Sequence, residues 1–342
     1  MKTRTKEPAI RSWHIVASVT TSLVLAATSA NAQMNTIVAE NFGGTGAALN
    51  GKTADTFAAA VTAAGGSGTW GAGAAFLDNG TVSVDALQNS AYLNLGSYIN
   101  NTKGTASGMF DLTMTISPTT GSWISLGFAT QNNPNTAKNF TDTGSGAAGT
   151  TTGIGTILYR ATDAAPTADA LACFGGTGNA NGLGNITDIT GNRTLTVTLD
   201  LTPAGGYNGT SNFGRVTWSD SVLGTLTNYT YTSARDFRSI LISEANSSGG
   251  AVSGLTLTQI LPPTLQISSH GGNLDFNWGS LAGKQYDLVA TNSLTAPIAT
   301  WPPYNDGVTT YTNIPAAVTG LNVLTNVKKV GPANFFILIE KP

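Results

Sequence analysis

Two carboxylates held about 5–10 Å apart can act as acid and as nucleophile or base in glycoside hydrolysis. In a strand, acidic residues two positions apart share a face and could form such a pair. Beyond residue 32 the glutamates are Glu40, Glu244 and Glu340, and none has an acidic partner at that spacing. We therefore expect no catalytic residues. Two aspartates that folding brings together could still supply the catalytic pair of a polysaccharide hydrolase or lyase.

Histidine and cysteine chemistry is equally sparse. His270 is the single histidine beyond residue 32, and it lies between Ser269 and Gly271 in an expected turn. One imidazole without cysteine or further histidine ligands does not make a zinc site. Cys173 is the only cysteine, which excludes an intrachain disulfide, and its apolar neighbours favour a small buried side chain over a reactive thiol.

Two short segments could supply oxygen ligands to a hard cation. Asp78-Asn79-Gly80 and Asp142-Thr143-Gly144 carry suitable side chains, but both are also typical of ordinary Asx turns. The chain has no Asp-x-Asp-x-Asp loop. We expect no cofactor, and the sequence leaves a structural calcium ion open.

Aromatic side chains are the strongest ligand candidates, because sugars stack on aromatic rings while nearby polar groups take their hydroxyls. Trp70 and Trp123 belong to the same group of aromatics, but a tryptophan in a β-sandwich is more often part of the core. Trp218 is followed by Ser219 and Asp220, which suggests a solvated edge. The predicted carbohydrate-binding residues are Trp218, Asp220, Tyr229, Tyr231, Tyr159 and Arg160, with Asp236 as a further polar neighbour.

Strands must position these residues, because apolar and polar side chains alternate along much of the chain. In residues 109–117 and again in 194–202, every second residue is apolar and its neighbours are mainly threonine, serine or aspartate. This period of two is typical of a strand with one buried face. Expected strands are 81–85, 91–98, 109–117, 122–130, 155–161, 170–174, 194–202, 214–219, 227–232, 239–243 and 254–260. We expect residues 118–121 to join two of them as a tight hairpin, and residues 54–64 to form a loop with one helical turn.

The first 32 residues have the pattern of a secretory signal. Four basic residues precede an apolar run, and Ala30-Asn31-Ala32 supplies small residues for cleavage. The apolar run is shorter than the roughly 20 residues of a membrane-spanning helix. We expect cleavage before Gln33, a secreted or cell-surface location, and no membrane insertion afterwards.

The charge of the remaining chain argues against a nucleic-acid partner. Without the signal, four of 16 basic residues and one of 18 acidic residues are lost, which leaves a net charge of about −5. No cluster of lysine and arginine is large enough for a phosphate-binding surface, so we expect no nucleic-acid partner.

Consecutive prolines at Pro262-Pro263 interrupt the strand pattern, because neither can donate to a sheet ladder. We therefore expect domains at 33–261 and 264–342. The second should have a core of Phe276 and Trp278 against Phe335 and Ile337.

Residues 38–260 resemble concanavalin-like jelly-roll domains of secreted bacterial proteins, which are related in shape to lectin and laminin-G families. The likeness is carried by Glu40-Asn41-Phe42, residues 121–128 (GSWISLGF) and residues 255–258 (LTLT). It implies two antiparallel sheets packed face to face, adjacent first and last strands, and glycan binding on the concave sheet.

Residues 264–342 resemble a small Ig-like or fibronectin-III-like module of exported proteins from Verrucomicrobia. The matching segments are 274–278 (LDFNW), 282–288 (AGKQYDL), Leu294-Thr295, Trp301 and Phe335-Phe336. Ile337 departs from the module's usual ending, which has arginine after the aromatic pair.

These patterns predict an all-β protein, an antiparallel jelly-roll β-sandwich followed by a smaller Ig-like β-sandwich. The function that we expect is non-catalytic binding of a polysaccharide or cell-surface glycan outside the cytoplasm. A structural or adhesive envelope protein without sugar binding is the first alternative, and a jelly-roll glycoside hydrolase or lyase is the second.

Overall fold

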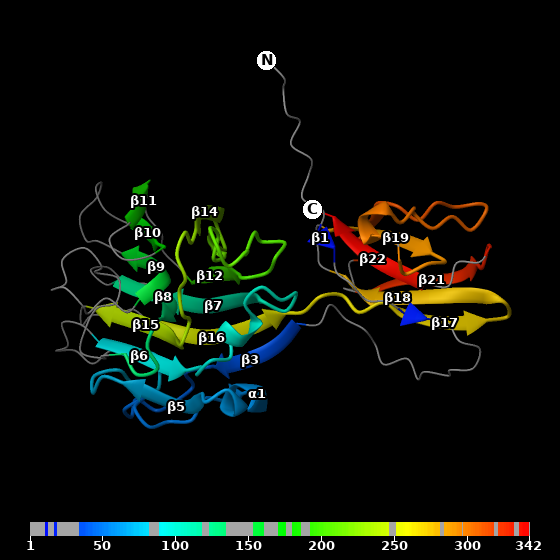
Figure 1. Cartoon of the computed structure of the whole chain (residues 1–342). Helices are drawn as coiled ribbons and strands as arrows, with labels where there is room; N and C mark the ends of the chain where they lie inside the picture. The colour runs from blue at the N-terminus through cyan, green and yellow to red at the C-terminus, as the bar shows by residue number, and fades with distance from the viewer. Residues whose placement is uncertain are drawn as a thin grey trace, which may run out of the picture. The chain divides into compact units, whose positions relative to one another are not determined.

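The computed structural model divides the chain into two compact units, Asn35–Gln259 and Ile260–Pro342 with Met1–Met34 (Figure 1). The residues that the structure describes are 11–12, 17–18, 34–81, 89–117, 123–134, 153–160, 170–175, 180–185, 192–245, 251–280, 284–295, 297–317, 321–331 and 335–341. The boundary between the units lies close to Pro262-Pro263, where two prolines prevent sheet pairing.

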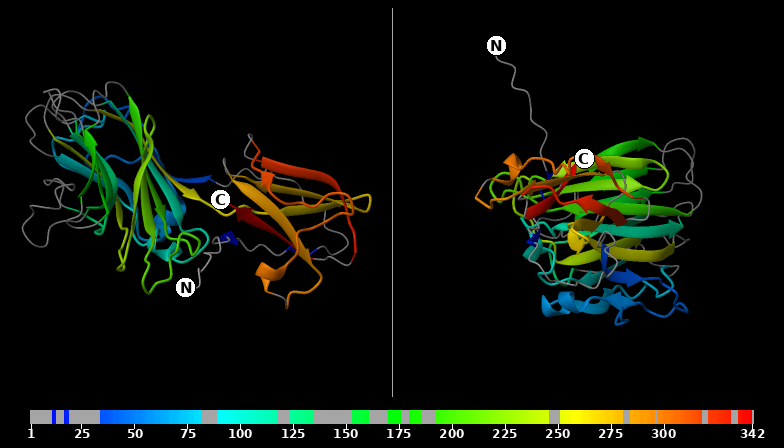
Figure 2. Two further views of the ribbon diagram at one scale, coloured as in Figure 1. Left: turned by 90° about the horizontal axis from the view of Figure 1, so that it is seen from above. Right: turned by 90° about the vertical axis from the view of Figure 1, so that its right-hand side faces the viewer.

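Two seven-stranded sheets form the Asn35–Gln259 unit. The first, called the β8 sheet, has the order β11 (Ala180–Asn185), β10 (Ala170–Phe174), β9 (Gly153–Arg160), β8 (Trp123–Ala129), β15 (Ser239–Ala245), β6 (Asn89–Asn94) and β5 (Ser67–Ala72). The second, called the β7 sheet, has the order β14 (Gly224–Thr230), β13 (Arg215–Asp220), β12 (Arg193–Asp200), β7 (Met109–Ser117), β16 (Ala251–Ile260), β3 (Met34–Glu40) and β4 (Thr56–Phe57). Figure 2 shows the two sheets as stacked layers.

The strand order agrees with the expected sandwich. Every pair whose register the described residues define is antiparallel, for example β12 with β7 and β15 with β8. β3 and β16, which open and close the unit, are neighbours in the β7 sheet. The fold class predicted from the alternating side chains is therefore confirmed.

The core lies between the sheets and is built from the alternating apolar positions. Phe110, Leu112, Met114 and Ile116 of β7 are fully buried, whereas the residues between them are partly exposed. Burying one such side chain contributes roughly 1.5–3 kcal/mol to folding. The pattern that predicted the strand thus also defines which of its faces points inward.

One predicted connection is wrong. β7 pairs with β12 and β16, whereas β8 pairs with β9 and β15, so the segment between β7 and β8 joins the two sheets and is not a hairpin. Residues 118–122 themselves lie outside the described part of the chain. Within residues 54–64 the structure has a five-residue helix, α1 (Ala59–Ala63), before Gly65 turns the chain at φ 83°.

The second unit contains two smaller antiparallel sheets. One has β17 (Gln266–His270), β18 (Asn273–Gly279) and β21 (Leu321–Lys328), and the other has β22 (Phe335–Lys341), β19 (Gln285–Thr291) and β20 (Ile314–Pro315). Two short 3-10 turns, η1 (Asn100–Thr102) and η2 (Ile298–Thr300), complete the described helical elements of the chain. His270 is an exposed residue at the end of β17.

The core of this unit contains Phe336 of β22, where the sequence predicted its neighbours Phe335 and Ile337. Phe276 packs on Phe336, with ring centroids 5.1 Å apart. Phe335 and Ile337 lie on the other face of β22, where they form a separate cluster with Trp301. The prediction was wrong for β22 because successive side chains of a strand point to opposite faces.

Two short segments of the predicted signal peptide pair with β22. β1 (Arg11–Ser12) lies opposite Glu340 and Ile339, and β2 (Ala17–Ser18) lies opposite Phe336 and Phe335. Among the described residues, no helix is long and apolar enough to cross a membrane.

Candidate functional site

Tyr92 of β6 lies on the outer face of the β8 sheet, the face directed away from the β7 sheet. Its chain neighbours Ala91 and Leu93 are fully buried in the core, so the alternation of the strand turns Tyr92 outward. The ring packs over Gly71 of the adjacent β5, where a Cβ atom would come within 2.2 Å of Cζ of Tyr92. Gly71 therefore provides the space that lets this partly exposed ring lie against the sheet.

Apolar and polar groups both contact the Tyr92 side chain. Ala129 and Leu241 form a small buried cluster with the ring. The phenol OH donates a 3.4 Å hydrogen bond to Oδ1 of exposed Asn133. Ser239 Oγ donates to the carbonyl oxygens of residues 131 and 132, at 2.7 and 3.0 Å, which holds this loop over the sheet. We call partly exposed Tyr92 and exposed Asn133, with the buried Leu241 and Ser239 that support them, the Tyr92 surface.

Small hydroxyl side chains continue the same face, and those of Ser90, Ser125, Ser243 and Thr156 are buried. The Oγ atoms of Ser90 and Ser243 are 2.7 Å apart, and Ser125 lies opposite Ser243 on β8. Thr156 of β9 packs over Gly127, where a Cβ atom would come within 2.4 Å of Thr156 Cγ2. The described outward positions of β6, β8, β15, β9 and β10 contain no aspartate or glutamate. This part of the face therefore supplies no carboxylate pair of the kind that glycoside hydrolysis uses.

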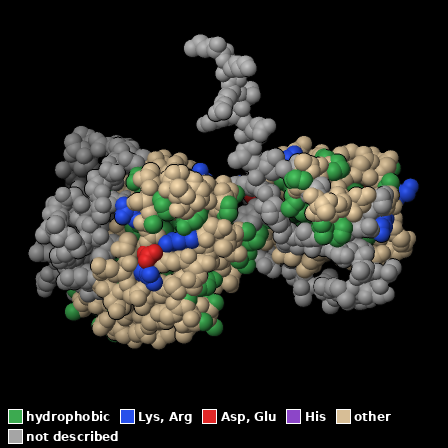
Figure 3. Space-filling model, in the orientation of Figure 1, with side chains coloured by type: hydrophobic (Ala, Val, Ile, Leu, Met, Phe, Trp, Pro, Cys, Tyr) green, Lys and Arg blue, Asp and Glu red, His purple; other side chains and the backbone are tan. Residues whose placement is uncertain are grey.

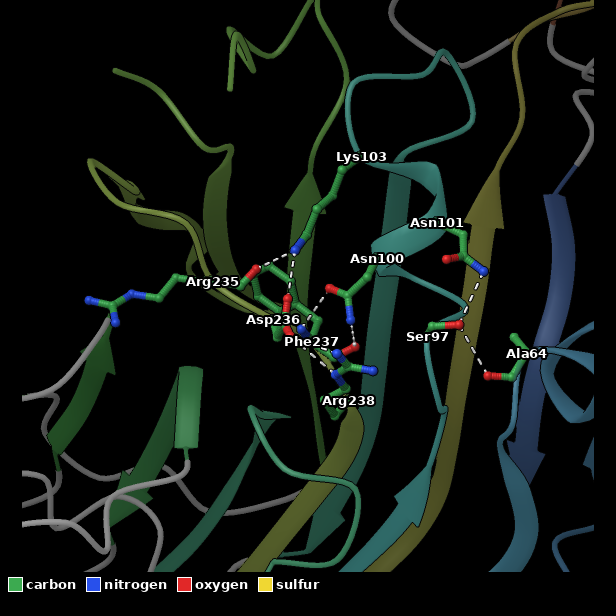
Figure 4. A network of polar contacts seen from close by, with 9 residues as sticks. All are labelled: Ala64, Ser97, Asn100, Asn101, Lys103, Arg235, Asp236, Phe237 and Arg238. Carbon is green, nitrogen blue, oxygen red and sulfur yellow. Dashed lines mark hydrogen bonds and ion pairs between the residues drawn. The ribbon is translucent and has the colours of Figure 1, made fainter. Parts of the chain in front are cut away.

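A group of charged side chains lies at the end of the β8 sheet where β6 ends and β15 begins (Figure 4). Lys103 Nζ is 3.1 Å from Asp236 Oδ1, and it also donates to the carbonyl oxygen of Arg235 at 2.6 Å. Arg238 donates twice to Asp236 Oδ2, from Nη2 at 2.7 Å and from Nε at 3.2 Å. The hydrogen bonds from Arg238, and then from Lys103, hold the pKa of Asp236 below its ordinary value. We call Lys103, Arg235, Asp236 and Arg238 the basic cluster.

Side-chain amides fix the two loops that carry this cluster. Asn100 Oδ1 accepts from the Phe237 backbone N–H at 3.0 Å, and Asn100 Nδ2 donates to the Phe237 carbonyl at 3.3 Å. Asn101 Nδ2 donates to Ser97 Oγ, which donates to the Ala64 carbonyl, both at 3.2 Å. Figure 4 shows this network on both sides of the segment that leads to Lys103. The loops are thus held by hydrogen bonds within the Asn35–Gln259 unit.

Three of the predicted sugar-stacking residues lie inside the sandwich. Trp218 and Tyr159 have no exposed surface, and Tyr231 has 1%. The Trp218 indole N–H donates a 3.2 Å hydrogen bond to the Gly155 carbonyl in the opposite sheet. The prediction that Trp218 lies at a solvated edge is wrong, since β13 turns Trp218 inward and Ser219 outward. A ring without an exposed face cannot stack on a sugar in this conformation.

The other predicted residues are only partly brought together. Tyr229 is half-buried, and its ring lies 5.3 Å from that of Tyr231. Asp220 is buried and forms an ion pair with Arg193. Arg160 belongs to β9, and its side chain lies outside the described part of the structure.

Trp70 and Glu40 also have structural contacts. The Trp70 indole N–H donates to Glu40 Oε2 at 3.0 Å, and the Phe42 N–H donates to Glu40 Oε1 at 3.1 Å. The side chain of Trp123 lies outside the described residues.

The segments considered for calcium do not form a ligand set in the described residues. Asp78 Oδ1 accepts from the Gly46 N–H at 2.7 Å, and Oδ2 is 3.5 Å from Lys52 Nζ. These donors occupy the side that a cation would need, so this arrangement does not fit calcium. Asp142 lies outside the described part of the chain. Across the described residues, no three His, Cys, Asp or Glu side chains are grouped closely enough to hold a metal ion.

Sequence reasoning missed Tyr92 and most of the basic cluster, although local signals for both are present. Tyr92 stands between Ala91 and Leu93, which places it on the face opposite the core. Arg235-Asp236-Phe237-Arg238 is a dense run of charge in a chain with only 10% charged residues.

The stacked sheets define the Asn35–Gln259 unit as an antiparallel β-sandwich. No family model and no curated protein sequence matches the chain. Among solved structures it is similar to the carbohydrate recognition domain of Emp47p, with 12% identity, a TM-score of 0.37, and coverage of 66% of this chain and 96% of that one. The metal-free Emp46p carbohydrate recognition domain gives 12% identity, a TM-score of 0.34, and 55% and 87% coverage. A legume lectin-like domain from Entamoeba histolytica gives 10% identity, a TM-score of 0.25, and 52% and 79% coverage.

Proposed function

We propose that the protein is an exported carbohydrate-binding protein whose Asn35–Gln259 unit holds a glycan at the Tyr92 surface without modifying it. Export is supported by the pattern of the first 32 residues, and the small two-sheet unit fits the proposed Ig-like module at 264–342. The glycan is a polysaccharide or a cell-surface glycan.

One observation carries the sugar-binding proposal. A partly exposed tyrosine ring is held against the outer face of a sheet by Gly71, beside an exposed amide and a small apolar cluster. Pyranose rings have apolar faces that stack on aromatic side chains, while their hydroxyls bond to amides and hydroxyls. Tyr92 and Asn133 supply both kinds of contact at one place.

A non-catalytic role is supported by the composition of the face. Its described outward positions carry no carboxylate; the hydroxyls of Ser90, Ser125 and Ser243 are buried, so Tyr92 and neighbouring Asn133 are the groups offered to a sugar. Most of the surface seen in Figure 3 is likewise neutral, with few charged side chains. Neutral polar surfaces recognise hydroxyl groups without supplying a general acid or base.

The test compares the chain starting at Gln33 with Tyr92→Ala and Tyr92→Phe in affinity electrophoresis, after a glycan array has identified retained polymers. We expect Tyr92→Ala to weaken binding about tenfold, equivalent to about 1.4 kcal/mol. Tyr92→Phe keeps the ring and loses only the hydrogen bond to Asn133, so its affinity should fall by about threefold at most.

Tyr311→Ala is the matched control, because it removes a half-buried tyrosine from the second unit. It should leave the affinity unchanged, with circular dichroism to verify folding of each variant. If the wild-type protein is retained on no glycan, the carbohydrate-binding proposal is wrong. If Tyr92→Ala binds with unchanged affinity, the assignment of the binding site to Tyr92 is wrong.

A further inference from the structure

The Asn35–Gln259 unit has little positive charge, and much of it is gathered at the basic cluster. The sequence of this unit contains eight lysine and arginine residues, three of which belong to the cluster. In the described part of the unit, Lys52, Arg193 and Arg215 each lie within 4 Å of a different aspartate. The basic cluster instead has three cations and one carboxylate, that of Asp236, which pairs with Lys103 and Arg238. It is therefore a local excess of positive charge on a chain that is negative as a whole.

Asp236 neutralises only part of this charge. Its carboxylate is shared between Lys103 and Arg238. The Arg235 side chain points away from Asp236 in Figure 4. Asp236 pairs with Lys103 and Arg238, and no described carboxylate lies within ion-pair distance of Arg235. Arg235 is partly exposed, so its guanidinium can bind an anion from solution with two parallel hydrogen bonds.

The basic cluster lies next to the Tyr92 surface in the fold. Arg238 precedes Ser239, whose hydroxyl holds residues 131 and 132 beside Asn133. The Arg238 carbonyl also accepts from the Leu95 N–H at 2.7 Å, directly after β6 ends. Both groups of residues therefore occupy the same end of the β8 sheet. A polymer bound along Tyr92 would extend toward fixed positive charge.

We propose that the glycan is an acidic polysaccharide, whose carboxylate or sulfate groups bind Arg235 and Arg238 while a sugar ring stacks on Tyr92. This inference rests on the proposed carbohydrate binding and specifies the chemical class of the ligand. The cluster carries only three cations, which is few for a duplex that binds through six to ten phosphates. An acidic glycan needs fewer ionic contacts, because stacking and hydroxyl bonds supply the rest of its affinity.

The experiment uses homogalacturonan in two forms, de-esterified with free carboxylates and fully methyl-esterified with the same sugar backbone. Affinity electrophoresis of the chain starting at Gln33, in about 50 mM NaCl, should show at least tenfold tighter binding to the free-acid form. The difference should shrink as salt rises toward about 0.5 M, because exposed ionic contacts are screened. Dextran sulfate and dextran form a parallel pair that distinguishes sulfate from carboxylate as the acidic group.

Arg235→Gln should lower the affinity for the preferred acidic polymer by about fivefold or more and leave the affinity for its neutral counterpart unchanged. Arg235 lies within ion-pair distance of no described carboxylate, so this variant should keep the wild-type melting temperature. Lys329→Gln is the matched control, since it removes an exposed cation from the second unit and should change neither affinity.

The acidic-ligand inference would be overturned if acidic and neutral polymers bound equally well and Arg235→Gln had no effect on affinity. The proposed function would still stand if Tyr92→Ala weakened binding in the same experiment. Binding to no polymer would overturn both. Retention on duplex DNA as strong as on the acidic polymer would show general polyanion binding and would also overturn the inference.

Discussion

Arg193 Nη1 and Asp220 Oδ1 form a 2.8 Å ion pair inside the sandwich of the Asn35–Gln259 unit. The Arg193 side chain is 7% exposed, and that of Asp220 is fully buried. Asp220 Oδ1 also accepts from the backbone N–H groups of Val222 and Leu223, at 2.9 and 3.0 Å, where β13 turns into β14. This carboxylate therefore holds the fold together and is not free to bind a sugar.

Asp220→Ala should destabilise the unit by about 3–5 kcal/mol, because it leaves Arg193 buried without its counter-charge. Urea unfolding followed by circular dichroism measures this loss. Asp236→Ala serves as the comparison, since Asp236 is about half exposed and its removal should cost about 1 kcal/mol or less. A stable Asp220→Ala protein that had lost glycan binding would restore Asp220 as a ligand-binding residue.

Glu244→Gln should make the protein less sensitive to alkaline pH. Burial raises the pKa of Glu244 well above its ordinary value, and Oε1 has no hydrogen-bond partner in the described structure. The folded chain therefore favours the protonated acid, whereas the unfolded chain ionises above about pH 4.5. The stability from Glu244 is fully present below that pH and is lost as pH rises toward the folded pKa, by about 1.4 kcal/mol per pH unit.

Urea unfolding of wild type and Glu244→Gln at pH 4, 6 and 8 tests this sign. The two proteins should be close in stability at pH 4, and the variant should become the more stable one as pH rises. Equal pH dependence of the two would contradict a protonated Glu244 in the folded state.

Cys173 should resist thiol reagents in the folded protein. Its side chain is fully buried in β10, and burial raises the pKa of the thiol to about 12. At pH 8 the folded protein should therefore show almost no reaction with Ellman's reagent over minutes, and it should react fully in 6 M guanidinium chloride. Rapid labelling without denaturant would indicate that β10 opens locally or that the thiol is reachable.

The strands and their buried faces could be predicted because alternation is a local property. The inward set of β7, from Phe110 to Ile116, follows directly from apolar residues at every second position. Proline cannot continue a ladder, and the division between the two compact units, after Gln259, lies close to Pro262-Pro263. Such features depend only on residues close together in the sequence.

Contacts between residues far apart in the sequence could not be predicted from local alternation. The polar neighbours Ser219 and Asp220 suggested a solvated edge at Trp218, but alternation places Trp218 and Ser219 on opposite faces. The burial of Asp220 depends on Arg193, which lies 27 residues away. The position of the Tyr92 ring depends on Gly71 in another strand, and no pattern within β6 reveals that partner. Sequence reasoning thus identified the sandwich, whereas Trp218, Tyr159 and Tyr231, three of its predicted stacking residues, lie in the core.

β22 has β19 on one side and the segments Arg11–Ser12 and Ala17–Ser18 on the other. If maturation removes these segments, the sheet becomes narrower and the backbone N–H and C=O groups on that border lose their partners. Such an open border can accept an extended segment from another molecule. Processing at Gln33 would then leave β22 as an edge strand that can pair with a strand of another molecule.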